Sequence, residues 1–102
     1  MGTRLELQAK LEAALGSRNV YYQPPASVTM NYPAIVYSKA WIKNERANNV
    51  NDYMKTVRYS ITVIDRRPDN PAIDTMLTWP YCVYDRHYIS DNLNHDVLTL
   101  YY

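Results

Sequence analysis

The residues best suited to chemistry lie near the end of the chain, where histidines and carboxylates gather. His87, His95, Asp85, Asp91 and Asp96 fall within one stretch of 12 residues. Imidazole and carboxylate groups bind metal ions and transfer protons. Their spacing argues against such a site, because eight positions and a turn separate the histidines and no H-E-x-x-H pattern occurs. We therefore expect no metal here. A small metal-dependent hydrolase centred on His87, His95 and Asp91 is kept as a less favoured alternative.

The same stretch also has a structural interpretation. His95 and Asp96 are expected to cap the turn before the last strand, and Asp85 and Arg86 to pair across a sheet. No catalytic residue follows from this interpretation.

Two other enzymatic patterns are weak. Cys82 and His87 lie five residues apart on one expected strand, which predicts opposite faces and excludes a nucleophile with its base. The single cysteine can form no internal disulfide and is expected to be a buried thiol. Gly2 and Gly16 are the two glycines, too few for a phosphate-binding loop. We expect neither an enzyme nor a cofactor.

The rest of the chain is organised around a long strand at residues 52–65, DYMKTVRYSITVID. Apolar and polar residues alternate there with a period of two, which is typical of a half-buried antiparallel strand. Residues 53–64 would span about 40 Å, whereas a domain of this length is only about 33 Å across. The first half of the strand is therefore expected to protrude as a hairpin arm, paired with residues 41–46 across a turn at 47–51.

Two helices are expected. Thr3 and Glu6 form a capping box before an apolar stripe that predicts a helix over residues 4–15, ended by Gly16. Asn70 is expected to cap a second, short helix that begins with a proline and stops before Pro80. Its short connections place it on the same sheet face as the first helix.

The remaining elements are strands. The pattern predicts a short strand at 20–23, a strand at 34–43, a tip at 44–52, a strand at 82–90, a turn at 91–94 and a strand at 97–102. The expected fold class is α+β, with a mainly antiparallel sheet, an N-terminal helix and a second short helix on one face, and a long β-hairpin arm. Residues 1–102 are expected to form a single domain.

Composition narrows the choice of partners. A net charge of +1 argues against a general nucleic-acid or anionic membrane surface. Short apolar runs and the polar start predict neither a membrane span nor a signal peptide, so we expect a chain made in a cytoplasm. The chain has 11 Tyr, 2 Trp and no Phe. Tyrosine suits surfaces buried on association and also the rim of a core, and the sequence leaves both interpretations open.

Three segments together resemble one protein family. YPAIVYSKAWI, VRYSITVIDRRPDN and CVYDRHYISDNLNHDVLTLYY are similar to the small tail terminator, or tail completion, proteins of long-tailed bacteriophages. The resemblance runs over most of the chain. It implies a non-enzymatic virion protein that is made in the host cytoplasm. Such a protein would form a homo-oligomeric ring, a hexamer, on the tail tube. The ring would end tube polymerisation and join the tail to the head connector. Another neck or head-tail connector protein of the phage is the alternative.

The expected contact residues follow from the arm and the resemblance. The partners would be other copies of the chain, the tail tube protein and head-tail connector proteins, with no membrane and no sequence-specific nucleic acid. A monomeric nucleic-acid binder that uses tyrosine and arginine is a further alternative. Arg58, on the polar face of the long strand, would line a lumen, pair between subunits, or be a solvated side chain. The expected interface residues are Trp41, Lys43, Arg46, Tyr53, Met54, Lys55, Tyr101 and Tyr102.

Overall fold

The computed structural model describes residues 3–25, 29–46 and 53–102, and within strands the side chains of 41–46 and 53–56 are not described. One five-stranded sheet has the order β1-β2-β3-β5-β4. The β1–β2 pair is parallel and the other pairs are antiparallel. The strands are β1 (Val20–Tyr22), β2 (Ala34–Arg46), β3 (Tyr53–Asp65), β4 (Cys82–Ser90) and β5 (Leu93–Tyr101).

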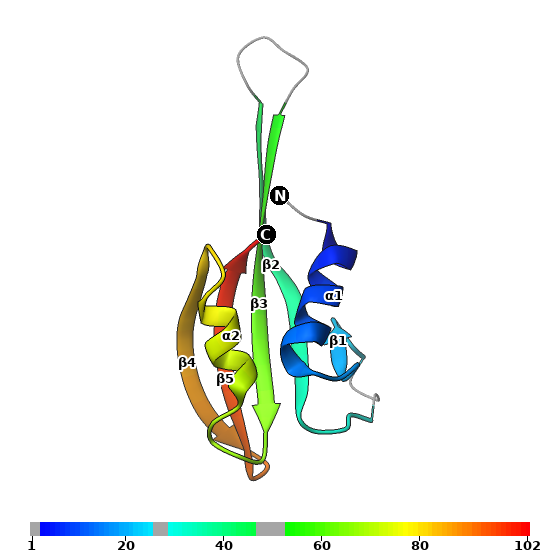
Figure 1. The fold of residues 1–102 in the computed structure, drawn as a ribbon. Coiled ribbons are helices and arrows are strands. Elements are labelled where there is room, and N and C mark those ends of the chain that lie inside the picture. The colour runs from blue at the N-terminus through cyan, green and yellow to red at the C-terminus, as the bar shows by residue number, and fades with distance from the viewer. Residues whose placement is uncertain (1–2, 26–28, 47–52) are drawn as a thin grey trace.

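Two helices pack on one face of this sheet, α1 (Arg4–Leu15) and α2 (Pro71–Leu77) (Figure 1). The α+β class, the mainly antiparallel sheet and the two helices on one face are confirmed. Neither described helix is long and apolar enough to cross a lipid bilayer.

Local chemistry sets the ends of both helices. The Thr3 hydroxyl accepts a hydrogen bond from the Glu6 N–H at 3.2 Å, which satisfies one of the free donors of the first turn. Gly16 ends α1 with φ +74, a left-handed conformation that glycine adopts without a steric penalty. The Asn70 side chain accepts from the Ala72 N–H at 2.8 Å and caps α2. These capping predictions are confirmed.

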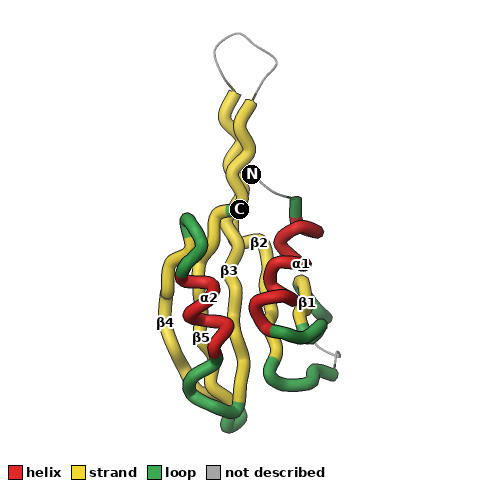
Figure 2. The backbone as a smooth tube through the Cα atoms, viewed as in Figure 1, coloured by secondary structure: helices red, strands yellow, loops and turns green. Residues whose placement is uncertain are grey.

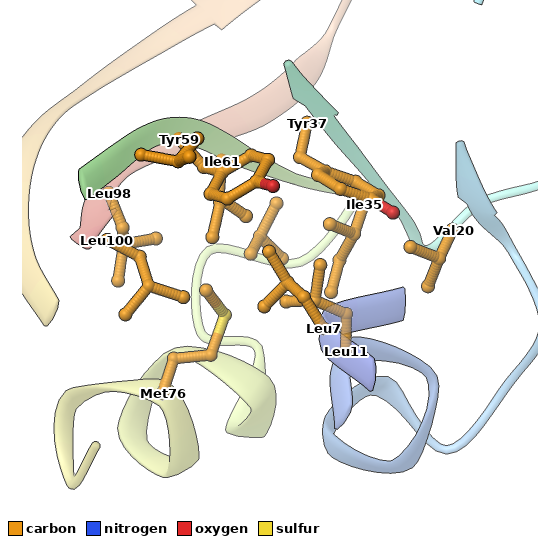
Figure 3. Packing of buried hydrophobic residues seen from close by; sticks show 12 residues of the cluster. Leu7, Leu11, Val20, Ile35, Tyr37, Tyr59, Ile61, Met76, Leu98 and Leu100 are labelled. Carbon is orange, nitrogen blue, oxygen red and sulfur yellow. The ribbon is translucent and has the colours of Figure 1, made fainter. Parts of the chain in front are cut away.

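The core lies between the helices and the sheet (Figure 3). Leu7 and Leu11 point from α1 and Met76 from α2 toward the central strands. The sheet side of this cluster includes Ile35, Tyr37, Val57, Tyr59, Ile61, Val63, Leu98 and Leu100. Alternate residues of β2, β3 and β5 supply it, as the period of two predicts.

Strands β2 and β3 are longer than the body that they cross. Each has 13 residues, yet β5 pairs with β3 only from Arg58 to Asp65, and β1 pairs with β2 only around Ile35 to Tyr37. Within the described part of the chain, their far halves pair only with each other, and they project beyond the helices (Figures 1 and 2). The molecule extends 53 × 30 × 23 Å. The expected hairpin arm is thus present, and we refer to residues 41–46 and 53–56 as the arm.

Two expected boundaries are wrong by more than one residue. Strand β2 continues through Asn44 to Arg46, beyond the expected start of the tip at 44, because the arm pairs as far as Arg46 with Tyr53. The remainder of the expected tip, 47–52, lies outside the described residues. Strand β5 begins at Leu93 rather than 97.

The early start of β5 has a backbone cause. Asp91 and Asn92 both have positive φ, 53 and 61, so two residues suffice to reverse the chain between β4 and β5. His95 and Asp96 consequently lie inside the strand and do not cap the turn, which corrects the structural interpretation of that stretch.

Candidate assembly interface

The structure brings the arm residues expected at an interface onto one hairpin. The β2–β3 register pairs Trp41 with Arg58 and Arg46 with Tyr53, so the six residues lie along two adjacent strands. Five of them occupy positions beyond Arg58, the last β3 residue paired with β5: Lys43, Arg46, Tyr53, Met54 and Lys55. The backbone alone is described here, since the side chains of the arm lie outside the described residues.

The two C-terminal tyrosines lie at the base of the arm but differ in environment. Tyr101 is 38 % exposed, and its N–H donates to the Tyr81 carbonyl at 3.2 Å. Tyr102 packs against the core, and its N–H donates to the Val57 carbonyl at 3.1 Å. Tyr101 therefore offers a surface for contact, whereas Tyr102 is held mainly by its own chain.

Arg58 lies on the sheet face that no described helix covers. Its register partners are Trp41 on β2 and Tyr101 on β5, and its neighbour Tyr59 points into the core. Nearby on this face, Ser38, Ser60 and Thr99 lie side by side across three strands. Small side chains with hydroxyl groups, which both donate and accept hydrogen bonds, therefore occupy the middle of the uncovered face.

Sequence reasoning missed an exposed strand at the edge of the sheet. Strand β4 pairs with β5 on one side only, because it lies last in the sheet order. Its Val83 and Ile89 are 61 % and 67 % exposed. Among the described residues, a group of exposed large hydrophobic side chains falls between positions 81 and 89: Tyr81, Val83, Tyr84, Tyr88 and Ile89. The strand was readable from the sequence, but its position at the edge was not.

Some of the tyrosines lie in the core and others lie exposed on the surface. Tyr37 and Tyr59 are buried in the core, with ring centroids 6.0 Å apart. Tyr81, Tyr84 and Tyr88 are exposed along the β4 edge. Core use therefore accounts for part of the tyrosine content, and an exposed group remains for contacts with partners.

The two histidines do not form a common site. His87 shares a 3.0 Å hydrogen bond with Asn94 on the helix side of the sheet, where its register partner is Asp96. His95 shares a hydrogen bond with the Leu93 carbonyl at 3.1 Å and stacks on Tyr88, its register partner on the other face, at 4.7 Å. Within the described ranges, no three His, Cys, Asp or Glu residues are grouped so that they could hold a metal ion.

A β-bulge changes the faces of β4. The register with β5 shifts between Tyr84 and Arg86, so the alternation of side chains moves by one residue. Cys82 and His87 consequently share the helix-side face, which corrects the expectation of opposite faces. They remain about 15 Å apart along the strand, too far for a nucleophile and its base. Cys82 is only half-buried, not fully buried as expected, and burial raises the pKa of its thiol.

The polar side chains next to the bulge in β4 have partners that the sequence did not predict. Asp85 and Arg86 do not pair across the sheet as expected, but form an exposed ion pair with each other at 3.4 Å. On the helix side, the Tyr84 hydroxyl donates to the buried Asp96 at 2.7 Å. This hydrogen bond, with a contribution from burial, raises the pKa of Tyr84.

Comparisons with known proteins add no family assignment. No family model matches the chain, and no curated protein is similar to it in sequence.

Proposed function

We propose that this chain is a structural protein of a phage virion, which forms a ring of identical subunits, six in number, on the end of the tail tube. In this role it ends tube polymerisation and joins the tail to the head connector. The proposal draws on the resemblance of three sequence segments to tail terminator proteins, and on the shape of the molecule. No reaction is part of it.

The projecting arm is the observation that carries the proposal. Two strands of 13 residues each continue past the body, and no other strand among the described residues pairs with their far halves. An isolated two-stranded hairpin is marginally stable in water. A neighbouring subunit or the tube would supply the surface that such an element lacks.

The base of the arm extends the same surface. Tyr101 is partly exposed beside Arg58 in the register, on the face that no described helix covers. In a ring, this face with its small hydroxyl groups would line the lumen or contact the next subunit. Arg58 would then lie between the contact made by the arm and that made by Tyr101.

The decisive experiment uses purified tail tubes from the source phage, incubated with the purified chain and imaged by electron microscopy. The expected result is one ring at one end of each tube and no further growth when free tube protein is added. A double variant, Lys43→Glu with Lys55→Glu, is expected to weaken binding to tube ends at least about tenfold, because both substitutions reverse charge within the arm.

Lys39→Glu is the matched control, because Lys39 is exposed on the same strand but within the body. Binding by this variant should equal that of the unchanged chain. A chain that binds no tube end would refute the proposal. Binding only to isolated heads would instead assign the chain to another position in the neck.

A further inference from the structure

The outer edge of β4 offers unpaired backbone groups along a nine-residue strand. The Tyr81 carbonyl accepts from the Tyr101 N–H, so the backbone of Tyr81 faces β5. Because backbone direction alternates along a strand, Cys82 and Tyr84 present their N–H and C=O groups to the open side. The bulge shifts this alternation, so His87 and Ile89 do so in the second half.

The bulge makes the two halves of β4 mirror each other. In the first half, Cys82 and Tyr84 lie on the helix side and Val83 on the other, as their partners Leu100, Leu98 and Thr99 show. In the second half, His87 and Ile89 lie on the helix side and Tyr88 on the other, opposite Asp96, Asn94 and His95. Counted outward in either direction from the point between Asp85 and Arg86, the order of faces is the same over residues 82–84 and 87–89.

This symmetry allows the strand to pair with itself. In an antiparallel pair centred between Asp85 and Arg86, Val83 lies opposite Tyr88 of a second copy and Tyr84 lies opposite His87. Each pair then consists of residues on the same face, as antiparallel pairing requires. Asp85 lies opposite Arg86 of the second copy, so opposite charges meet twice at the centre.

The bulge and the central charges of β4 also disfavour pairing with a strand of different sequence. A bulge and central charges commonly protect an edge strand from a regular partner, because the register is lost past the bulge. In the antiparallel pair, a second copy of β4 places its bulge opposite this one and brings the complementary charge. The exposed Val83, Tyr88 and Ile89 would be covered at the same time.

We propose that the free chain forms a two-fold dimer in which β4 pairs antiparallel with β4 of a second copy, Asp85 of each chain facing Arg86 of the other. The two sheets join into one. This inference goes beyond the proposed virion function, because it concerns the chain in the absence of tail components. A two-fold contact closes on itself and adds no third subunit. The dimer would therefore leave ring formation to the tube end.

Light scattering behind a sizing column, over a range of concentrations, tests the dimer. The expected mass is twice 12.0 kDa. Asp85→Arg should raise the dimer dissociation constant at least about tenfold, because it brings two arginines together at both symmetry-related positions. The double variant Asp85→Arg with Arg86→Asp should restore the dimer, since the charges then face each other again. Asp69→Arg, the same change in an exposed loop residue, should leave the dimer intact.

Disulfide formation tests the register itself, in a Cys82→Ser background. Val83→Cys and Tyr88→Cys should each give little covalent dimer alone, because neither position faces its own copy. A mixture of the two variants should form a covalent heterodimer under mild oxidation, since opposed Cα atoms at such positions lie about 4.5 Å apart. Circular dichroism of every variant should match that of the unchanged chain.

A monomer of 12.0 kDa at every concentration would overturn the proposal. So would a dimer that survives Asp85→Arg unchanged, or a mixture that forms no heterodimer. Since no tail component is present in these experiments, their failure would leave the binding of tube ends unaffected, and the two proposals are separately testable.

Discussion

The Asn70 side chain donates a hydrogen bond to Oδ2 of Asp65 across 2.8 Å and thereby ties the end of β3 to the start of α2. Both residues are buried. Asp65 also accepts from the Arg67 N–H at 3.1 Å, and Asn70 caps α2 through Ala72. One carboxylate therefore sets the turn that returns the chain from the sheet to the helix layer.

Replacing Asp65 by Asn should destabilise the protein most at neutral pH. Burial alone would raise the pKa of Asp65, but hydrogen bonds from the Arg67 N–H, the Asn70 side chain and the Arg67 guanidinium outweigh it and lower the pKa below 3.8. The carboxylate thus contributes stability that is present above pH 3.8 and is lost as pH falls through the lower folded-state value. Urea unfolding should show a loss of about 1–3 kcal/mol at neutral pH, shrinking in acid.

Arg67→Ala is the control for this prediction. The guanidinium of Arg67 is largely exposed, so its ion pair with Asp65 should contribute less than about 1 kcal/mol. An equal loss in both variants, or a loss in Asp65→Asn that does not change with pH, would contradict the assignment to the buried hydrogen bonds.

Tyr84→Phe should lower the free energy of unfolding by about 1 kcal/mol, because it removes the donor to the buried Asp96. Since this hydrogen bond raises the pKa of Tyr84, its contribution should be fully present below pH 10.0 and be lost as pH rises through the higher folded-state value. Tyr81→Phe is the matched control at a 75 % exposed position and should change little. Thermal unfolding of the two variants side by side measures the difference.

Lys10→Gln should weaken the contact between α1 and the end of the chain. The Lys10 ammonium lies 4.5 Å from the Trp79 ring centroid and 5.7 Å from that of Tyr102. Loss of this cation–π contact should cost about 0.5–1 kcal/mol in chemical unfolding. Lys10→Arg retains a cation and should recover most of the loss, whereas equal instability in both variants would point to packing instead.

Leu11→Ala should cost about 2–5 kcal/mol, because Leu11 is fully buried between α1 and the sheet. Leu5→Ala, at a position of the same helix that is 68 % exposed, should stay within about 0.5 kcal/mol of the unchanged chain. Denaturant midpoints of the pair provide the measurement. A comparable loss in the two variants would disprove the assigned orientation of α1.

Much of the fold was predictable because its signals are local. Thr3 with Glu6, Gly16, and Asn70 before a proline mark helix ends through contacts within a few residues, and alternation marks the strands. The arm was predictable from the length of the strand, since a strand longer than the diameter of a compact domain must project from it. The boundary errors arose from backbone details, such as the paired positive φ values of Asp91 and Asn92.

The β4 edge could not be read from the sequence, because it depends on strand order. The alternation of Cys82–Ser90 is compatible with a central strand as well as an edge strand, and β5, the last strand in the chain, inserts between β3 and β4. The bulge could not be predicted either, since no sequence feature around Asp85 indicates an extra residue in the strand. The face of each β4 side chain therefore required the structure.

The continuity of β3 from the arm into the core has a mechanical consequence. The far part of β3 belongs to the arm, while Arg58 to Asp65 form its ladder with β5. A pulling force applied to the arm along the strand would load the rungs of this ladder together, in shear, rather than one after another. The arm can thus transmit tension to the body without a hinge, and the protein should resist stretching along this axis more strongly than peeling of β4 from the edge.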